Sequence, residues 1–266
     1  MEGTKRMQLG APPREASSQR PQLARSPIAL VVCQVRFDSH SVEAKQVLEM
    51  QRILGQGEYP GITQFAGPDV RLQLGDQFIP STIRQDAWQL STADGSWAIT
   101  LGGESVALQT TNGYTTWEES FQPRLDVLVQ AVQECIAPTM EQRLGLRYVN
   151  QLADLLVTGP GDLAQYFENS LLPGLQHELF GSALVAAQNQ LVLRLDADIS
   201  CGLRLGFAPE GGHPNRYSGV VDIDLYRDTA QSFDPVQIMA AADIFNDRAH
   251  EIFRAALNPD YLGSLE

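Results

Sequence analysis

The sequence predicts an α+β fold in which a mainly antiparallel sheet carries two long helices on one face. Segments that alternate apolar and polar residues recur along the chain, and glycine-containing turns separate several of them. Two longer stretches carry apolar residues at helical spacing. Both halves, 27–138 and 139–266, have the order strand, helix, three or four strands and long helix. We therefore interpret 27–266 as a single domain built from a duplicated β-α-β(3-4)-α unit.

The first half is expected to begin with a strand at 27–37, PIALVVCQVRF, in which alternate residues are apolar. A helix should follow from Ser41, a residue type that favours the N-cap, and should end at Gly55. Asp-Gly and Gly-Gly dipeptides then indicate tight hairpins between strands. These three strands are expected near 83–91, 96–101 and 104–110.

A long helix is predicted to close the first half. The pairs Thr115 with Glu118 and Thr116 with Glu119 both have the spacing of a capping box. Apolar residues then follow on one helical stripe, at Leu125, Leu128, Val129, Val132 and Ile136. Pro123 has no amide donor, so it predicts either a kink or a second helix start nearby.

The second half is expected to repeat this order. A strand at 142–151 should be followed by a helical stretch near 161–172. Four strands are then expected, near 180–187, 190–198, 200–208 and 219–226. The last helix has the strongest start signal, with Asp234 as N-cap, Pro235 at the first helical position and Phe233 placed to pack on Ile238.

Charge and composition restrict the class of protein. The 266 residues contain 19 basic and 32 acidic side chains, a net charge of -13, which disfavours generic nucleic-acid binding. Residues 1–26 are an exception, because this Pro-, Ser- and Gln-rich arm is basic, and we expect it to be disordered. No signal sequence or membrane span is recognised, so a cytoplasmic location is expected. The three cysteines have no paired spacing, and neither disulfides nor a zinc site is predicted.

Candidate binding residues lie on the predicted strands of the second half. Alternation places Arg147 and Asn150 on opposite sides of the 142–151 strand. Further polar residues alternate out of the later strands, at Arg194, Arg204, Asp222 and Asp224. These side chains either line a polar groove for a charged ligand or form a solvated sheet face with cross-strand ion pairs.

One further candidate is His250, which lies on a polar edge of the last helix with Asp243, Asp247 and Arg254. It is a candidate proton carrier in an enzymatic interpretation. No second histidine cluster accompanies it, and no nucleophile or phosphate-binding signature occurs elsewhere. No catalytic residue, cofactor or metal site is therefore predicted.

Four sequence blocks in order are similar to a sporadically distributed prokaryotic family of uncharacterised proteins. The blocks are SPIALVVCQVRF, GYTTWEESF, RLGLRYVNQL and DRAHEIFRAALNPDYLGSLE, and together they span nearly the whole chain after the basic arm. Members of this family more often have an acidic residue where this chain has Ala29 or Leu30. The resemblance implies the extent of the domain and a setting near defence or mobile-element genes, but it carries no catalytic residues.

The sequence leaves three functional hypotheses. The first is a non-enzymatic adaptor or antitoxin-like protein that binds a protein partner, with a basic partner favoured by the acidic charge. The alternative is a small-ligand-binding protein or enzyme that uses a polar groove on the open face of the sheet. A saddle that grips nucleic acid is the third, and the acidic body argues against it.

Overall fold

The computed structural model describes residues 23, 26–65, 71–74, 77–80, 87–156, 160–180, 183–210 and 216–265. Most of the predicted basic arm lies outside these residues, as do positions 83–86 of the first predicted hairpin strand. All statements below concern the described residues.

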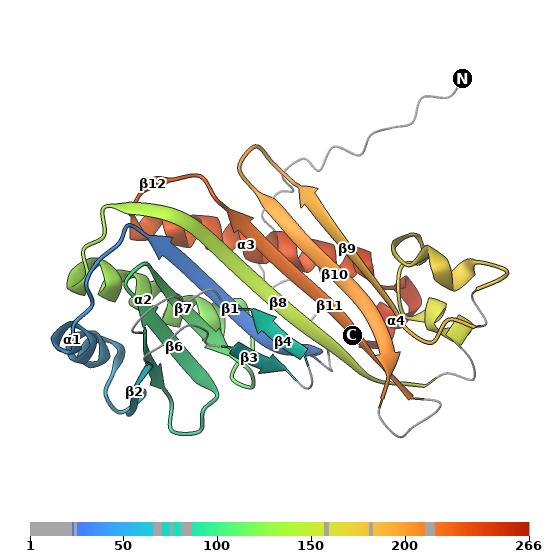
Figure 1. Ribbon diagram of the computed structural model, residues 1–266, viewed down its shortest axis with the longest axis horizontal. Coiled ribbons are helices and arrows are strands. Elements are labelled where there is room, and N and C mark those ends of the chain that lie inside the picture. The colour runs from blue at the N-terminus through green and yellow to red at the C-terminus, as the bar shows by residue number, and fades with distance from the viewer. Residues whose placement is uncertain are drawn as a thin grey trace.

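An antiparallel sheet of ten strands forms the centre of the fold (Figure 1). In spatial order, nine of the strands are β2 (Gly61–Phe65), β5 (Ala87–Ser91), β6 (Trp97–Gly102), β7 (Ser105–Thr110), β1 (Ile28–Phe37), β8 (Met140–Leu156), β11 (Arg216–Arg227), β10 (Ser200–Pro209) and β9 (Ala187–Arg194). The tenth, β12 (Gln231–Ser232), pairs with the start of β8. A separate hairpin consists of β3 (Arg71–Leu74) and β4 (Gln77–Pro80). The predicted α+β class with an antiparallel sheet is confirmed.

The seam between the two halves is the pairing of β1 with β8. It runs antiparallel from Ile28 opposite Asn150 to Phe37 opposite Glu141, with an irregularity near each end. Each of these strands has a strand of its own half on its other side, β7 beside β1 and β11 beside β8. The two halves therefore share one continuous sheet.

In the view of Figure 1 the helices lie behind the sheet, except for the first, which lies beyond the left end of the sheet. They are α1 (Ala44–Leu54), α2 (Gln122–Cys135), α3 (Pro235–Ala256) and α4 (Pro259–Leu265), with a short π-helical turn, η2 (Trp117–Phe121), immediately before α2. The Tyr148 hydroxyl on β8 donates to Asn246 of α3 at 2.9 Å. The indole Nε1 of Trp117 and the amide of Gln122 both donate to Asp243 of α3, each at 2.8 Å. These bonds join the helix of the first half to the helix of the second.

Alternation along the strands decides which side chains form the core. Leu144, Leu146 and Tyr148 of β8 are buried on the helix side of the sheet, as are Val31, Cys33 and Val35 of β1. On α3, apolar residues at helical spacing are buried, from Ile238 through Phe245 to Phe253. Burial of this kind stabilises a fold by roughly 25 cal/mol per Å² of apolar surface.

Several predicted boundaries are confirmed. Asp234 caps α3 by accepting a hydrogen bond from the Val236 amide at 2.9 Å. Thr116 caps η2 through the Glu119 amide, and Gly55, with φ of 97°, ends α1. The second of the two outcomes predicted for Pro123 occurs, because α2 starts at Gln122 directly after η2.

Other expectations were wrong. The first helix starts at Ala44 rather than after Ser41, because Glu43 and Gln46 form a reciprocal capping box there. No separate strand covers the described part of 180–187, where turns precede β9 at Ala187. The helical stretch expected near 161–172 is present, but as short 3-10 helices rather than one continuous helix: η3 (Pro160–Gln165), η4 (Asn169–Leu171) and η5 (Pro173–Gln176). The strand β2 was not predicted.

Candidate functional site

Arg147 of β8 and Asp222 of β11 form a two-bonded ion pair on the face of the sheet opposite the helices. Tyr148 reaches α3, so its neighbour Arg147 points to the other face. Arg147 Nε and Nη2 donate to Asp222 Oδ1 and Oδ2, both at 2.7 Å. The side chains are only 19% and 10% exposed, respectively. A paired guanidinium and carboxylate in this geometry are held in fixed positions.

Four further charged side chains extend this pair across the strands. Arg204 Nη1 of β10 lies 3.7 Å from Asp222 Oδ2. Arg143 of β8 lies between two carboxylates, with Nε 3.1 Å from Asp228 Oδ1 and Nη2 3.7 Å from Asp224 Oδ2. We call the six residues the charged lattice: Arg143, Arg147, Arg204, Asp222, Asp224 and Asp228. Its three cations balance its three carboxylates.

Strand register explains why these residues meet. Arg204 is directly opposite Asp222, and Arg147 is directly opposite Asp224. Residues two apart on one strand share a face, so each strand contributes charges to the same side. Five of the six lattice residues are therefore a direct product of the alternation in RLGLRYVN, LRLG and VVDIDLY, while Asp228 follows the end of β11.

Gly145 makes room for the Arg143 side chain. A Cβ atom at Gly145 would lie 2.7 Å from Arg143 Nη1, which is too close for non-bonded atoms. With only hydrogen there, the Arg143 guanidinium lies over the Tyr226 ring, 5.1 Å from its centroid. Tyr226 is directly opposite Gly145 on β11. The glycine, the arginine and the tyrosine form one packed unit at the end of the lattice.

The lattice shifts the acid–base properties of two of its members. Burial raises the pKa of Asp224 above its usual value, and Asp222 adds to the rise, although Arg143 and Arg147 oppose it. For Arg147, burial lowers the pKa, but the hydrogen bonds and charge of Asp222 outweigh burial and the pKa is raised. Burial therefore disfavours the charged form of Asp224 within the lattice.

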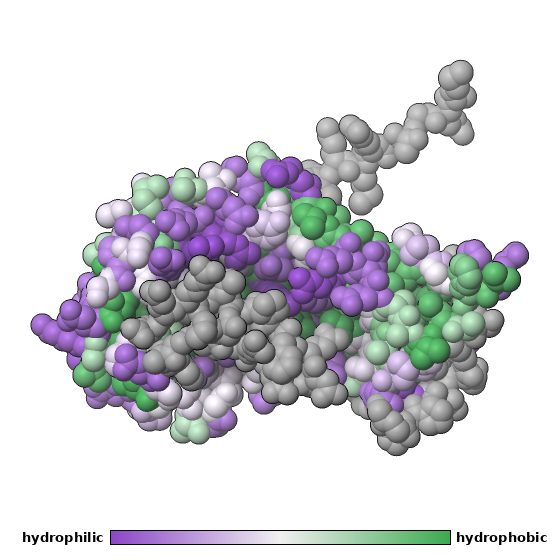
Figure 2. Space-filling view, in the orientation of Figure 1, coloured by the Kyte–Doolittle hydropathy of each residue, from purple (hydrophilic) through white to green (hydrophobic). Residues whose placement is uncertain are grey.

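A small apolar cluster borders the lattice on the same face. Leu30 and Val149 are each 3% exposed and pack with Val32 and Val220, separately from the main core. Val32 is directly opposite Arg147, so the apolar cluster and the lattice adjoin. Figure 2, in the orientation of Figure 1, shows hydrophilic side chains over the strands of the second half on this face.

The structure brings four of the sequence-predicted site residues together: Arg147, Arg204, Asp222 and Asp224. The other three lie elsewhere. Asn150 is on the helix side, 4% exposed, and its Nδ2 donates to the Val221 carbonyl at 3.0 Å. Arg194 Nη1 donates to the Ala197 carbonyl within its own hairpin at 3.1 Å. His250 is on α3, behind the sheet, so it is not part of the lattice.

Three residues of the site were missed from the sequence: Arg143, Tyr226 and Asp228. Arg143 and Tyr226 carried a usable signal, because each stands an even number of positions from a predicted site residue on the same strand, Arg143 four from Arg147 and Tyr226 two from Asp224. Asp228 follows the end of β11 and no periodicity locates it.

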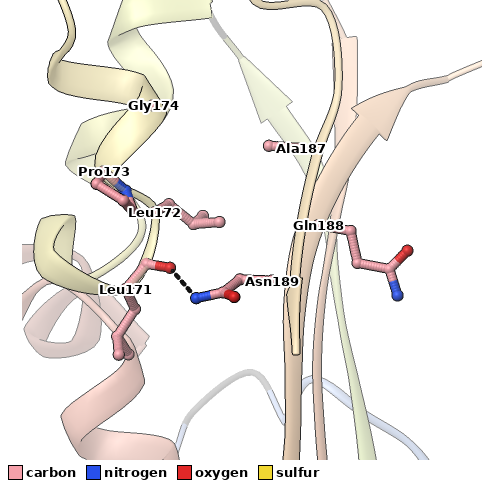
Figure 3. Close-up of a pocket in the computed structure, with 7 residues that line it drawn as sticks. All are labelled: Leu171, Leu172, Pro173, Gly174, Ala187, Gln188 and Asn189. Atoms are coloured by element: carbon pink, nitrogen blue, oxygen red, sulfur yellow. Dashed lines mark hydrogen bonds between the residues drawn. The ribbon is translucent and has the colours of Figure 1, made fainter. Parts of the chain in front are cut away.

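A hollow with a volume of about 240 Å³ lies away from the lattice, between η4–η5 and β9 (Figure 3). It is lined by 171–174 and 187–189, none of which is charged. Asn189 Nδ2 crosses it to donate to the Leu171 carbonyl at 2.8 Å, while Gln188 points to the other side of β9.

Comparison with protein-family models finds no match for this chain, and no curated protein matches it. Among the described residues, no helix is both long enough and apolar enough to cross a membrane.

Proposed function

We propose that this chain is a non-enzymatic protein-interaction module, of the adaptor or antitoxin-like class, that binds its partner over the charged lattice. The observation that carries the proposal is the arrangement of fixed charges of both signs on the sheet face opposite the helices. Such a pattern gives a partner both attractive and repulsive contacts, and these provide specificity more than affinity.

The exposure of the lattice residues supports binding to a broad partner surface. The centre, Arg147 with Asp222, is mostly buried, whereas the side chains of Arg204 and Asp228 are 44% and 62% exposed. Exposed charges around a fixed centre resemble the polar rim of a protein interface. The net charge of -13 would speed encounter with a basic partner, and the carboxylate of Asp228, although paired with Arg143, is exposed to one.

The alternative is a small-ligand-binding protein or enzyme, and the raised pKa of Asp224 is the observation that favours it. A carboxyl group with a raised pKa beside arginines is a candidate acid or base. His250 would take no part, since it lies on the helix side of the sheet.

We also propose that the halves 27–138 and 139–266 are a duplicated unit within one domain, with both long helices covering one face. The strand order supports the duplication, because β5-β6-β7-β1 on one side of the seam mirrors β9-β10-β11-β8 on the other. In each half the long helix follows the strand that is next to the seam strand. In the first half α2 follows β7 after the short η2, and in the second half α3 follows β11 after the short β12.

Affinity capture from native lysate tests the interaction proposal. The baits are the wild-type chain, Arg204→Glu in the lattice and Lys45→Glu on the exposed surface of α1, two variants with the same change in net charge. We expect a salt-sensitive partner on the wild type and on Lys45→Glu that is lost with Arg204→Glu. Recovery of bait alone across a range of salt concentrations, or equal capture by both variants, would contradict the proposal.

A second experiment separates the alternative from the leading proposal. Asp224→Asn removes the titratable group but keeps the shape of the side chain. Under the leading proposal, the variant still captures the partner, because Arg204 and Asp228 are unchanged. Loss of small-molecule turnover or binding in Asp224→Asn, with no protein captured by the wild type, would favour the alternative.

A further inference from the structure

The outer edge of β9 is a free strand edge. β9 ends the ten-stranded sheet, and all eight of its residues pair with β10 on one side. Within the described residues, no backbone hydrogen bond joins the other side of β9 to another segment. Free edges are usually protected by charge, proline or a bulge, because they can pair with another chain. β9 has an unbroken register, no proline, and Arg194 as its one charged residue.

The segment that leads into β9 and forms most of this edge is uncharged and rich in exposed apolar residues. From Leu179 to Leu193 the sequence has no charged residue, although the chain contains 19 basic and 32 acidic side chains. Nine large hydrophobic residues in the described part of the chain are exposed, and four of them lie in this segment. They are Leu179, Phe180, Val185 and Val192, which are 75%, 55%, 59% and 70% exposed. Figure 2 shows hydrophobic side chains gathered at this end of the molecule.

A row of apolar core residues continues from β10 onto β9, where its burial is incomplete. On the helix side, Cys201 and Leu203 of β10 are buried, at 0% and 3% exposed. Their partners on β9, Leu193 and Leu191, are only partly buried. A further strand with apolar residues at the same positions would complete the burial of this row.

We propose that the occupant of this edge is a second copy of this chain, paired antiparallel through β9 across a two-fold axis. A copy brings the same strand, uncharged up to Leu193, and the same apolar row, and its apolar residues would continue the core. Two copies of the chain, each with a net charge of -13, repel each other. They can approach most closely at a segment that carries no charge. This inference does not depend on the proposed function.

The strand is compatible with pairing to itself. With Leu191 opposite Leu191 of the copy, Gln190 meets Val192, and Gln188 meets Arg194. Asn189 then meets Leu193, no like charges are directly opposite, and the half-buried and exposed faces of the two strands stay matched. The dimer would form one continuous sheet and present the charged lattice twice. Because salt screens the repulsion between the acidic bodies, dimerisation should strengthen as ionic strength rises.

The oligomeric state of the full chain tests the proposal, measured by light scattering on a size-exclusion column over a range of concentrations. We expect the wild type to reach twice 29.2 kDa. Val192→Asp should be monomeric, because it adds repulsion and a poor strand residue at the edge. Val236→Asp on α3 is the matched control, since Val236 is 72% exposed and the charge change is the same. It should remain dimeric.

Backbone amide exchange provides a second, independent readout. At concentrations where the mass doubles, exchange over 188–194 should slow, while exchange over α1 should stay constant. A wild type that is monomeric at every concentration overturns the proposal. So does a dimer that Val192→Asp leaves intact with both variants folded, or a dimer whose protection appears outside β9.

Discussion

At the scale of single residues, Asp38 shows how one carboxylate can fix the path of the chain. Its Oδ1 accepts hydrogen bonds from the amides of Thr139 and Met140, both at 2.9 Å, and its Oδ2 accepts one from the Thr139 hydroxyl at 3.0 Å. Asp38 follows β1, and the two acceptor sites hold the start of β8. The bonds therefore connect residues about one hundred positions apart, at one end of the seam.

The pKa of Asp38 leads to a prediction about acid stability. The hydrogen bond from the Met140 amide is the largest cause that lowers this pKa from 3.8 to about 2. A carboxyl group with a lowered pKa in the folded state contributes stability above its unfolded pKa and loses it as the pH falls through the folded value. We expect Asp38→Asn to be less stable than the wild type at pH 7, with the difference shrinking between about pH 4 and pH 2. Urea unfolding at successive pH values measures this difference. A difference that stays constant over that range would contradict the prediction.

The sequence predicts some of the residue-level contacts and not others. Arg147 with Asp222 follows from alternation, because both side chains point away from the helices and lie on adjacent strands. The partner of Arg143 could not be inferred in the same way, since Asp228 lies beyond the end of its strand. Asp38 was missed because a loop carboxylate bonded to distant amides leaves no periodic pattern.

At the scale of elements, the hydrogen bonds of the capping residues explain where the helices start better than amino-acid composition does. Asp234 and Pro235 located the start of α3 from the sequence, because both act on the first turn alone. Ser41 failed as a start signal for α1, since Glu43 and Gln46 satisfy each other's backbone groups three residues later. The strands β9, β10 and β11 were expected within a few residues of their positions, whereas the division of the preceding helical stretch into short 3-10 helices was not. Short turns contain too few residues to show a period.

Removal of the α3 cap has a defined expected cost. Asp234→Ala leaves the Val236 amide without its side-chain acceptor, and loss of such a cap destabilises a protein by about 1 kcal/mol. Asp234→Asn keeps an oxygen acceptor at the same position and should lose much less. The free energy of unfolding in urea measures both. Equal losses in the two variants would show that the hydrogen bond is not the source of the effect.

At the scale of the whole molecule, the two halves are joined on both sides of the helix–sheet interface. The β1–β8 seam joins them in the sheet, and Asp243 joins α2 to α3 by accepting from Trp117 and Gln122. The α+β class and the antiparallel sheet were predictable from alternation and turns. The strand order was not, because pairing between distant strands depends on the complete chain.

This joining predicts a single unfolding transition. All three tryptophans, Trp88, Trp97 and Trp117, lie in the first half, so indole fluorescence reports on that half and, through the hydrogen bond of Trp117 to Asp243, on its contact with α3. Far-ultraviolet circular dichroism reports on both halves. We expect the two signals to give the same midpoint and slope in urea, as a cooperative two-state unit does. Fluorescence and dichroism curves with separate midpoints would show that the halves unfold independently.

The position of the seam also has a consequence for biosynthesis. The edge of β1 that pairs with β8 stays without its native neighbour until the ribosome has made and released β8. β1 ends at Phe37 and β8 ends at Leu156, 119 residues later. At translation rates of about 5–20 residues per second, that interval lasts on the order of ten seconds. The nascent chain thus carries an incomplete strand ladder for longer than most local folding takes, and it is a natural client for ribosome-associated chaperones during that time.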